Sequence, residues 1–86
     1  MPMSRHFEDF LTAYCAAEED LTDTAKILRQ HPDSELAQRV RAEIDTVISD
    51  RLLTLDDARR LMSRTFRTPA EAAEWLAARR VEWFGP

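Results

Sequence analysis

Glycine is almost absent from this chain of 86 residues, in which Gly85 is the only one. Phosphate-binding loops need several glycines, so the sequence excludes them, and tight two-residue β-hairpins are disfavoured for the same reason. The alternation of apolar and polar residues that is typical of strands is also missing, whereas Ala, Leu, Arg and Glu are abundant. We therefore expect a chain that is nearly all helical.

Cysteine, long apolar runs and excess positive charge are also lacking. Cys15 is the only cysteine, which excludes an internal disulfide and is typical of a reducing compartment. No apolar run approaches the roughly 20 residues that span a bilayer, and the amino terminus has no signal-peptide pattern. The net charge of −4 disfavours binding to nucleic acid, which relies on a basic stripe. These features predict a cytoplasmic protein with no contact to membrane or nucleic acid.

Residues 1–86 are expected to form a single domain, with 44% apolar and 33% charged residues, as in globular proteins. Ser4 is placed to cap a first helix. Four apolar residues follow at spacings of three and four and share one face: Phe7, Phe10, Leu11 and Tyr14. Glu18 would fall on the same face without a partner, so this helix is expected to end near Ala17.

A second helix is predicted over residues 22–30, capped by Asp20 or Thr22 and followed by Pro32. Asp33 or Ser34 then caps a third helix with the most regular apolar spacing: Leu36, Ala37, Val40, Ile44, Val47 and Ile48. Thr54 and Asp57 open a fourth helix. The segment TPAE at 68–71 is a complete helix start, and the last helix runs to about Trp83. The pattern predicts an all-α fold, a compact bundle of about five short amphipathic helices.

Catalytic and metal-binding patterns are weak. His6, His31 and Cys15 have no nucleophile signature around them, and a lone cysteine at the edge of an apolar face usually packs as a small hydrophobe. The carboxylates at 18–23 lack the alternating ligands and the glycine of a calcium loop, and no His or Cys pair has zinc spacing. We expect no enzyme, no catalytic residue, no metal, no cofactor and no small-molecule substrate.

One segment superficially resembles a DNA-binding helix-turn-helix, LTLDDARRLMSRTFRTPAEAAEWL, and residues 51–86 hold seven Arg against five acidic residues. However, Met62 stands where such motifs prefer glycine. The supposed recognition helix would open with Glu71 and Glu74, which repel phosphate. A small helix-turn-helix regulator, or a helical accessory subunit, therefore remains the alternative function.

An acidic cluster is the strongest candidate for function. Residues 1–24 contain six acidic residues and one Arg, a local balance of −5, whereas the rest of the chain has a balance of +1. The cluster is either a solvated loop or a surface for a basic partner. Tyr14 flanks it, and Trp75 projects about 100° from the centre of the last helix's apolar face, as a core-edge residue or an interface anchor. The candidate partner-binding residues are Tyr14, Glu18, Glu19, Asp20, Asp23 and Trp75.

Three stretches, FLTAYCAAEEDL, HPDSELAQRVRAEIDTVISDRLL and TPAEAAEWL, resemble the small all-α immunity proteins of bacterial contact-dependent growth inhibition systems. In that family an aromatic first helix ending in Tyr precedes an acidic turn, a long middle helix follows, and a Trp-Leu pair closes the domain. The matching positions are Phe10, Leu11, Tyr14, Asp20, Pro32, Ile44, Leu53, Trp75 and Leu76.

The resemblance implies an antidote that binds and neutralises a cognate toxin domain, often a nuclease, by occluding its active site. Nuclease toxins tend to be basic around the groove that holds their substrate, and an acidic protein can occupy such a groove as a phosphate mimic. Charge complementarity would mainly raise the association rate and the specificity.

Overall fold

Five α-helices form the fold of residues 3–86, the part of the chain that this computed structural model describes. They are α1 (Arg5–Tyr14), α2 (Leu21–Gln30), α3 (Glu35–Ser49), α4 (Leu55–Met62) and α5 (Pro69–Phe84). No strand occurs among those residues. The predicted all-α fold is confirmed, and the helices form a compact bundle of 32 × 27 × 24 Å.

Each helix begins at a polar side chain that accepts a hydrogen bond from a backbone N–H of its first turn. The five capping residues are Ser4, Asp20, Ser34, Thr54 and Thr68. Such caps satisfy N–H groups that have no partner within the helix. The sequence left Asp20 or Thr22, and Asp33 or Ser34, as alternatives; the structure uses the Asp20 and Ser34 side chains.

The helix ends are less regular than the starts. The expectation that the first helix ends near Ala17 is wrong, because α1 ends at Tyr14, three residues earlier. Cys15 and Ala16 turn into the core, and their carbonyls accept hydrogen bonds from Arg64 instead of from a continuing helix. The chain interior has no glycine, and Ser63, the residue that follows α4, adopts a left-handed conformation (φ 57°) that few non-glycine residues adopt.

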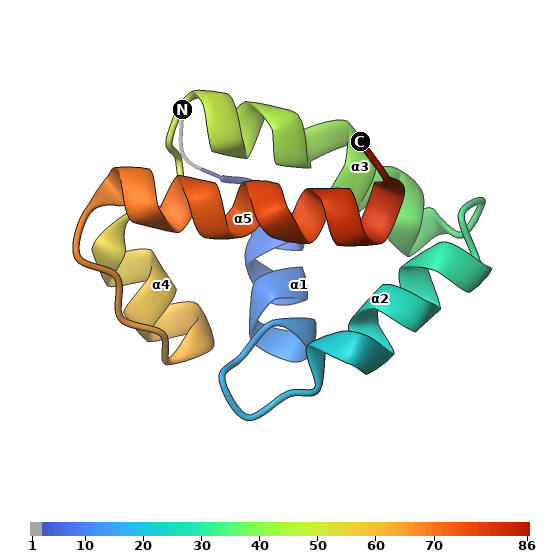
Figure 1. Cartoon of the computed structure of the whole chain (residues 1–86), viewed down its shortest axis with the longest axis horizontal. Helices are drawn as coiled ribbons and strands as arrows, with labels where there is room; N and C mark the ends of the chain where they lie inside the picture. The colour runs from blue at the N-terminus through green and yellow to red at the C-terminus, as the bar shows by residue number, and fades with distance from the viewer. Residues whose placement is uncertain (1–2) are drawn as a thin grey trace.

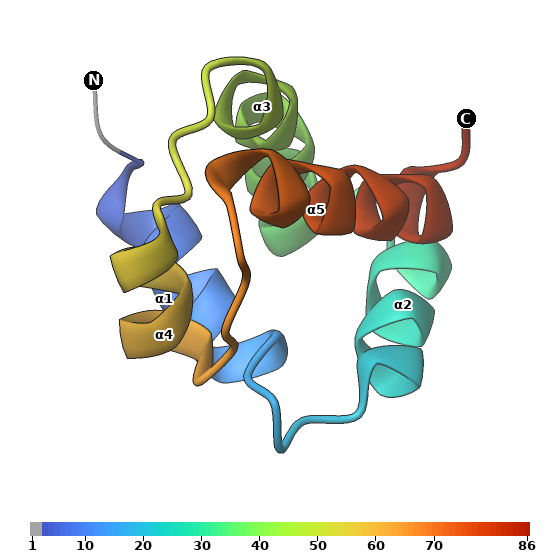
Figure 2. The same cartoon turned by 60° about the vertical axis from the view of Figure 1, so that its left-hand side comes forward.

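Helix α5 lies across the middle of the molecule and contacts α2, α3 and α4 (Figure 1). Helix α1 packs against α3 and α4, and its side chains reach the layer under α5. In the rotated view, α1 and α4 lie on one side below α5 and α2 lies on the other (Figure 2). The segment that joins α1 to α2 therefore passes along the end of the molecule opposite to α3.

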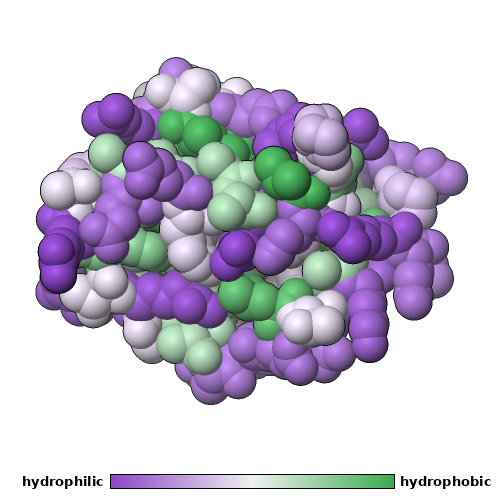
Figure 3. All heavy atoms as spheres, viewed as in Figure 1, coloured by the Kyte–Doolittle hydropathy of each residue, from purple (hydrophilic) through white to green (hydrophobic). Residues whose placement is uncertain are grey.

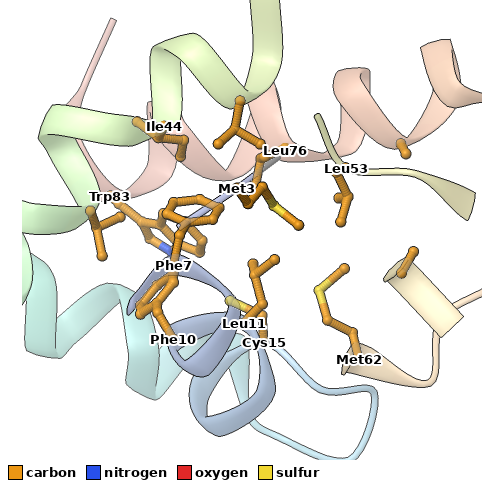
Figure 4. Close-up of a cluster of buried hydrophobic side chains, with 14 of the residues drawn as sticks. Met3, Phe7, Phe10, Leu11, Cys15, Ile44, Leu53, Met62, Leu76 and Trp83 are labelled. Atoms are coloured by element: carbon orange, nitrogen blue, oxygen red, sulfur yellow. The ribbon is translucent and has the colours of Figure 1, made fainter. Parts of the chain in front are cut away.

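A single apolar cluster holds these helices together. Phe7 and Leu11 of α1 point toward Ile44, Leu76 and Trp83 on α3 and α5 (Figure 4). Leu11, Ile44 and Leu76 are fully buried, which is where a leucine or isoleucine contributes most to stability. No helix among residues 3–86 has both the length and the apolar character needed to cross a membrane.

Candidate functional site

The acidic turn, residues 15–23, connects α1 to the first turn of α2 and carries the predicted carboxylates (Figure 1). Glu18, Glu19, Asp20 and Asp23 are all exposed to solvent. Asp20 has a structural role, because its Oδ1 accepts a hydrogen bond of 2.9 Å from the backbone N–H of Thr22 and so caps α2. The amino-terminal dipole of α2 favours the negative charge of both Asp20 and Asp23.

Arg64 holds the first half of the acidic turn against the segment after α4. Its Nε donates to the Cys15 carbonyl at 2.9 Å, and a terminal guanidinium nitrogen lies 3.5 Å from the Ala16 carbonyl. One residue further on, the backbone N–H of Ala17 donates to the Met62 carbonyl at 2.8 Å. Two backbone segments far apart in the sequence are therefore fixed to each other at the base of the turn.

Helix α2 holds the other half of the acidic turn. Thr24 is the only buried polar or charged residue among residues 3–86, and its Oγ1 donates to the carbonyl of Tyr14 at 2.8 Å. The hydroxyl thus satisfies a carbonyl at the carboxyl end of α1 that has no helical partner. Both ends of the segment that carries the exposed carboxylates are therefore tied to the rest of the fold.

Glu18, Glu19 and Asp23 form no ion pair within residues 3–86. Some carboxylates elsewhere in the fold are paired, for example Glu8 and Asp57 with Arg60, and Asp45 with Arg80. The charge of the turn is thus not neutralised by neighbouring side chains, and its field extends into solvent over about a Debye length, roughly 8 Å at physiological salt.

Trp75 lies half-buried against the core and contacts Arg64, which bonds to the acidic turn. The Arg64 guanidinium lies over its ring at 4.8 Å and that of Arg79 at 5.3 Å, while the Phe66 ring is 5.9 Å away. Arg79 Nε is also 3.2 Å from a carboxylate oxygen of Glu82, in an ion pair without hydrogen-bond alignment. This geometry makes Trp75 a support for Arg64, which in turn holds the acidic turn.

Tyr14 lies at the other side of the turn, at the end of an open groove of about 1100 Å³ between α1 and α3. Its ring stacks on Phe10 with centroids 5.6 Å apart, and it is half-buried. The six predicted residues therefore separate into three positions: the carboxylates on the turn, Tyr14 in the groove, and Trp75 under Arg64. Arg64 was missed, because nothing in its local sequence distinguishes it from the other arginines of residues 51–86.

Cys15 is fully buried, as expected for a cysteine that packs as a small hydrophobe. Burial raises the pKa of its thiol from 9.0 to about 12, and the nearby Arg64 and Arg79 oppose this shift only in part. The thiol is therefore protonated at neutral pH and is a poor nucleophile. Within residues 3–86, no three His, Cys, Asp or Glu side chains are grouped so as to hold a metal ion.

The segment that resembles a helix-turn-helix has a long connection in the structure. Helix α4 ends at Met62 and α5 begins at Pro69, so six residues separate them, whereas the DNA-binding motif uses a turn of about three to four. In addition, α5 buries Ala72, Leu76 and Trp83 in the core. On the face of the molecule seen in Figure 1, hydrophilic residues surround several small, separate groups of hydrophobic residues (Figure 3).

Comparison of the chain with protein-family models, with curated proteins and with solved structures found no match.

Proposed function

We propose that this protein is an immunity protein, which binds a cognate toxin domain and blocks its active site without catalysing a reaction. The observation that carries the proposal is the acidic turn: Glu18, Glu19 and Asp23 are exposed and unpaired on a segment that Arg64 and Thr24 hold in place. These contacts tie the two ends of the turn to the rest of the fold, so that its carboxylates are carried on an anchored segment. The resemblance of the sequence to immunity proteins of contact-dependent growth inhibition systems points to the same role.

A basic toxin, such as a nuclease, is the partner that best fits this turn. A nuclease concentrates positive charge where it holds the phosphates of its substrate, and a fixed group of carboxylates can occupy that region. Exposed charges of opposite sign raise the association rate and select the partner, while tight binding depends on a few buried anchors. Tyr14, half-buried beside the turn, is the proposed anchor. The protein would act in the cytoplasm of the cell that it protects.

The test starts from the gene directly upstream, which should encode a very large secreted protein with a variable carboxyl-terminal domain. That carboxyl-terminal domain, expressed alone in bacteria, should arrest growth, and co-expression of the present chain should restore growth. The purified pair should elute as a complex of one copy each. The proposal fails if the upstream gene encodes no such protein, or if growth stays arrested although both chains are present and folded.

A further inference from the structure

The groove is lined by side chains of α1 and α3. Near the start of α1, the backbone N–H and the hydroxyl of Ser4 both donate to Glu43, at 3.0 and 2.9 Å. Two residues further along the chain, the side chain of His6 lies 3.3 Å from that of Arg39, which is about one turn before Glu43 on α3. These contacts hold the start of α1 against α3, and the groove extends from them toward Leu36 and Tyr14, where the acidic turn begins.

The floor of the groove is apolar and aromatic. Phe10 and Val40 are buried beneath it, and Tyr14, Leu36 and Leu52 are half-buried along its sides. Ala13 is exposed at the rim of the groove, and its small side chain does not cover the groove next to Phe10 and Tyr14. Since apolar surface of this kind gains free energy when it leaves water, the groove is suited to apolar side chains of a ligand.

The charges around the groove are mostly negative. Asp9, Glu35 and Glu43 line it together with one basic residue, Arg39, and Arg39 forms an ion pair with Glu35 at 2.5 Å. Within residues 3–86, Asp9 and Glu43 form no ion pair, although Glu43 accepts the two hydrogen bonds from Ser4. The carboxylates of the acidic turn extend the negative field at one end. A ligand with basic residues beside its apolar ones complements this surface, whereas anionic lipid or nucleic acid would be repelled.

The groove favours a helix over an extended peptide as its occupant. It lies between two helices whose backbone groups are already paired, so an extended peptide would bury N–H and C=O groups without partners. A helix satisfies its own backbone groups and presents apolar side chains along one stripe. The α3 wall spans residues 35–46, which corresponds to about 18 Å or three helical turns.

We propose that the α1–α3 groove binds one amphipathic helix of a partner protein, with an apolar stripe on the floor and Lys or Arg residues facing Asp9 and Glu43. If the proposed function holds, this helix belongs to the toxin domain, and only that part of the inference rests on the proposed function. Tyr14 would then contact the helix at the end of the groove where the acidic turn begins.

The test uses synthetic helical peptides of about 14 residues with an apolar stripe at helical spacing. One peptide carries Lys beside the stripe, a second carries Glu at the same positions, and a third has the Lys peptide's composition in scrambled order. Binding to the full chain is followed by NMR. The Lys peptide should shift the amide signals of Phe10, Tyr14, Leu36 and Val40, and should bind about tenfold more tightly than either control.

Substitutions at exposed alanines separate occupation of the groove from general attraction between charges. Ala13→Arg and Ala13→Glu both place a long side chain at the groove, and each should weaken binding of the Lys peptide about tenfold. Ala78→Arg and Ala78→Glu make the same changes on exposed α5 and should leave binding unchanged. Circular dichroism would verify that the four variants keep their helix content.

Several results would overturn the inference. These are absence of binding by any peptide, equal binding of the Lys and Glu peptides, and shifts confined to the acidic turn. Dimerisation of the chain that Ala13→Arg abolishes would make a second copy the occupant instead. Failure here leaves the protection assay unaffected, and failure of protection leaves peptide binding unaffected, so the two proposals can be judged separately.

Discussion

Replacing Arg64 by Met should destabilise the protein by about 2–4 kcal/mol. Met keeps much of the side chain's apolar length but removes the hydrogen bond to the Cys15 carbonyl, and a bond from a charged donor is worth about 1.5–3 kcal/mol. The guanidinium over Trp75 adds about 0.5–1 kcal/mol at a partly exposed site. The 3.5 Å contact to Ala16 lies at the limit for a hydrogen bond and contributes little.

Urea unfolding followed by tryptophan fluorescence measures this loss. A domain of this kind is stable by only about 5–15 kcal/mol, so the midpoint should move clearly. Arg67→Met is the matched control, because Arg67 is an exposed arginine in the same connection and should change stability by less than about 0.5 kcal/mol. In native-state hydrogen exchange, the Ala17 amide, which donates to Met62, should exchange faster in Arg64→Met. Equal midpoints for the two variants would refute the role assigned to Arg64.

The remaining predictions concern the core. Leu76→Ala should cost about 2–5 kcal/mol because Leu76 is fully buried, whereas Val81→Ala, at a side chain 48% exposed, should cost far less in the same unfolding experiment. Cys15 should react with a thiol reagent at pH 8 only after unfolding, since a pKa of about 12 leaves about one thiol in ten thousand ionised; rapid labelling of the native protein would contradict its burial. Stability should also fall as pH rises above about 9, where the thiol ionises only in the unfolded chain, and Cys15→Ala should remove this dependence while retaining partner binding.

The sequence was sufficient to predict what depends on local interactions. Helix starts were correct because a capping side chain and the N–H groups that it accepts from are two or three residues apart, as at Ser4 and Thr68. The end of α1 was not, because Arg64, 49 residues away from Cys15, accounts for it. The left-handed end of α4 at Ser63 also lacked its usual sequence signal, a glycine.

The candidate site divides in the same way. That Glu18, Glu19 and Asp23 are exposed followed from their cluster of charges. The supports of the turn and the groove beside Tyr14 depend on how α1 packs against α3 and α4, and periodicity within one helix does not specify its neighbours. Trp75 illustrates the limit: its angle on α5 placed it at the edge of the core, but only the fold shows the two guanidinium groups over its ring.

The central claim, that the acidic turn is a partner surface, is tested most directly by the rate at which the protein associates with the toxin domain that it protects against. The test variant combines Glu18→Gln, Glu19→Gln and Asp23→Asn, and keeps Asp20 because it caps α2.

The matched control combines Asp33→Asn, Glu71→Gln and Glu74→Gln, which removes the same charge from exposed positions elsewhere. Stopped-flow measurements at low and high salt should show that the turn variant associates about tenfold more slowly at low salt and has lost most of its salt dependence, while the control resembles the unmodified protein. Equal rates and equal salt dependence for the two variants would contradict the account and leave the turn as a solvated loop.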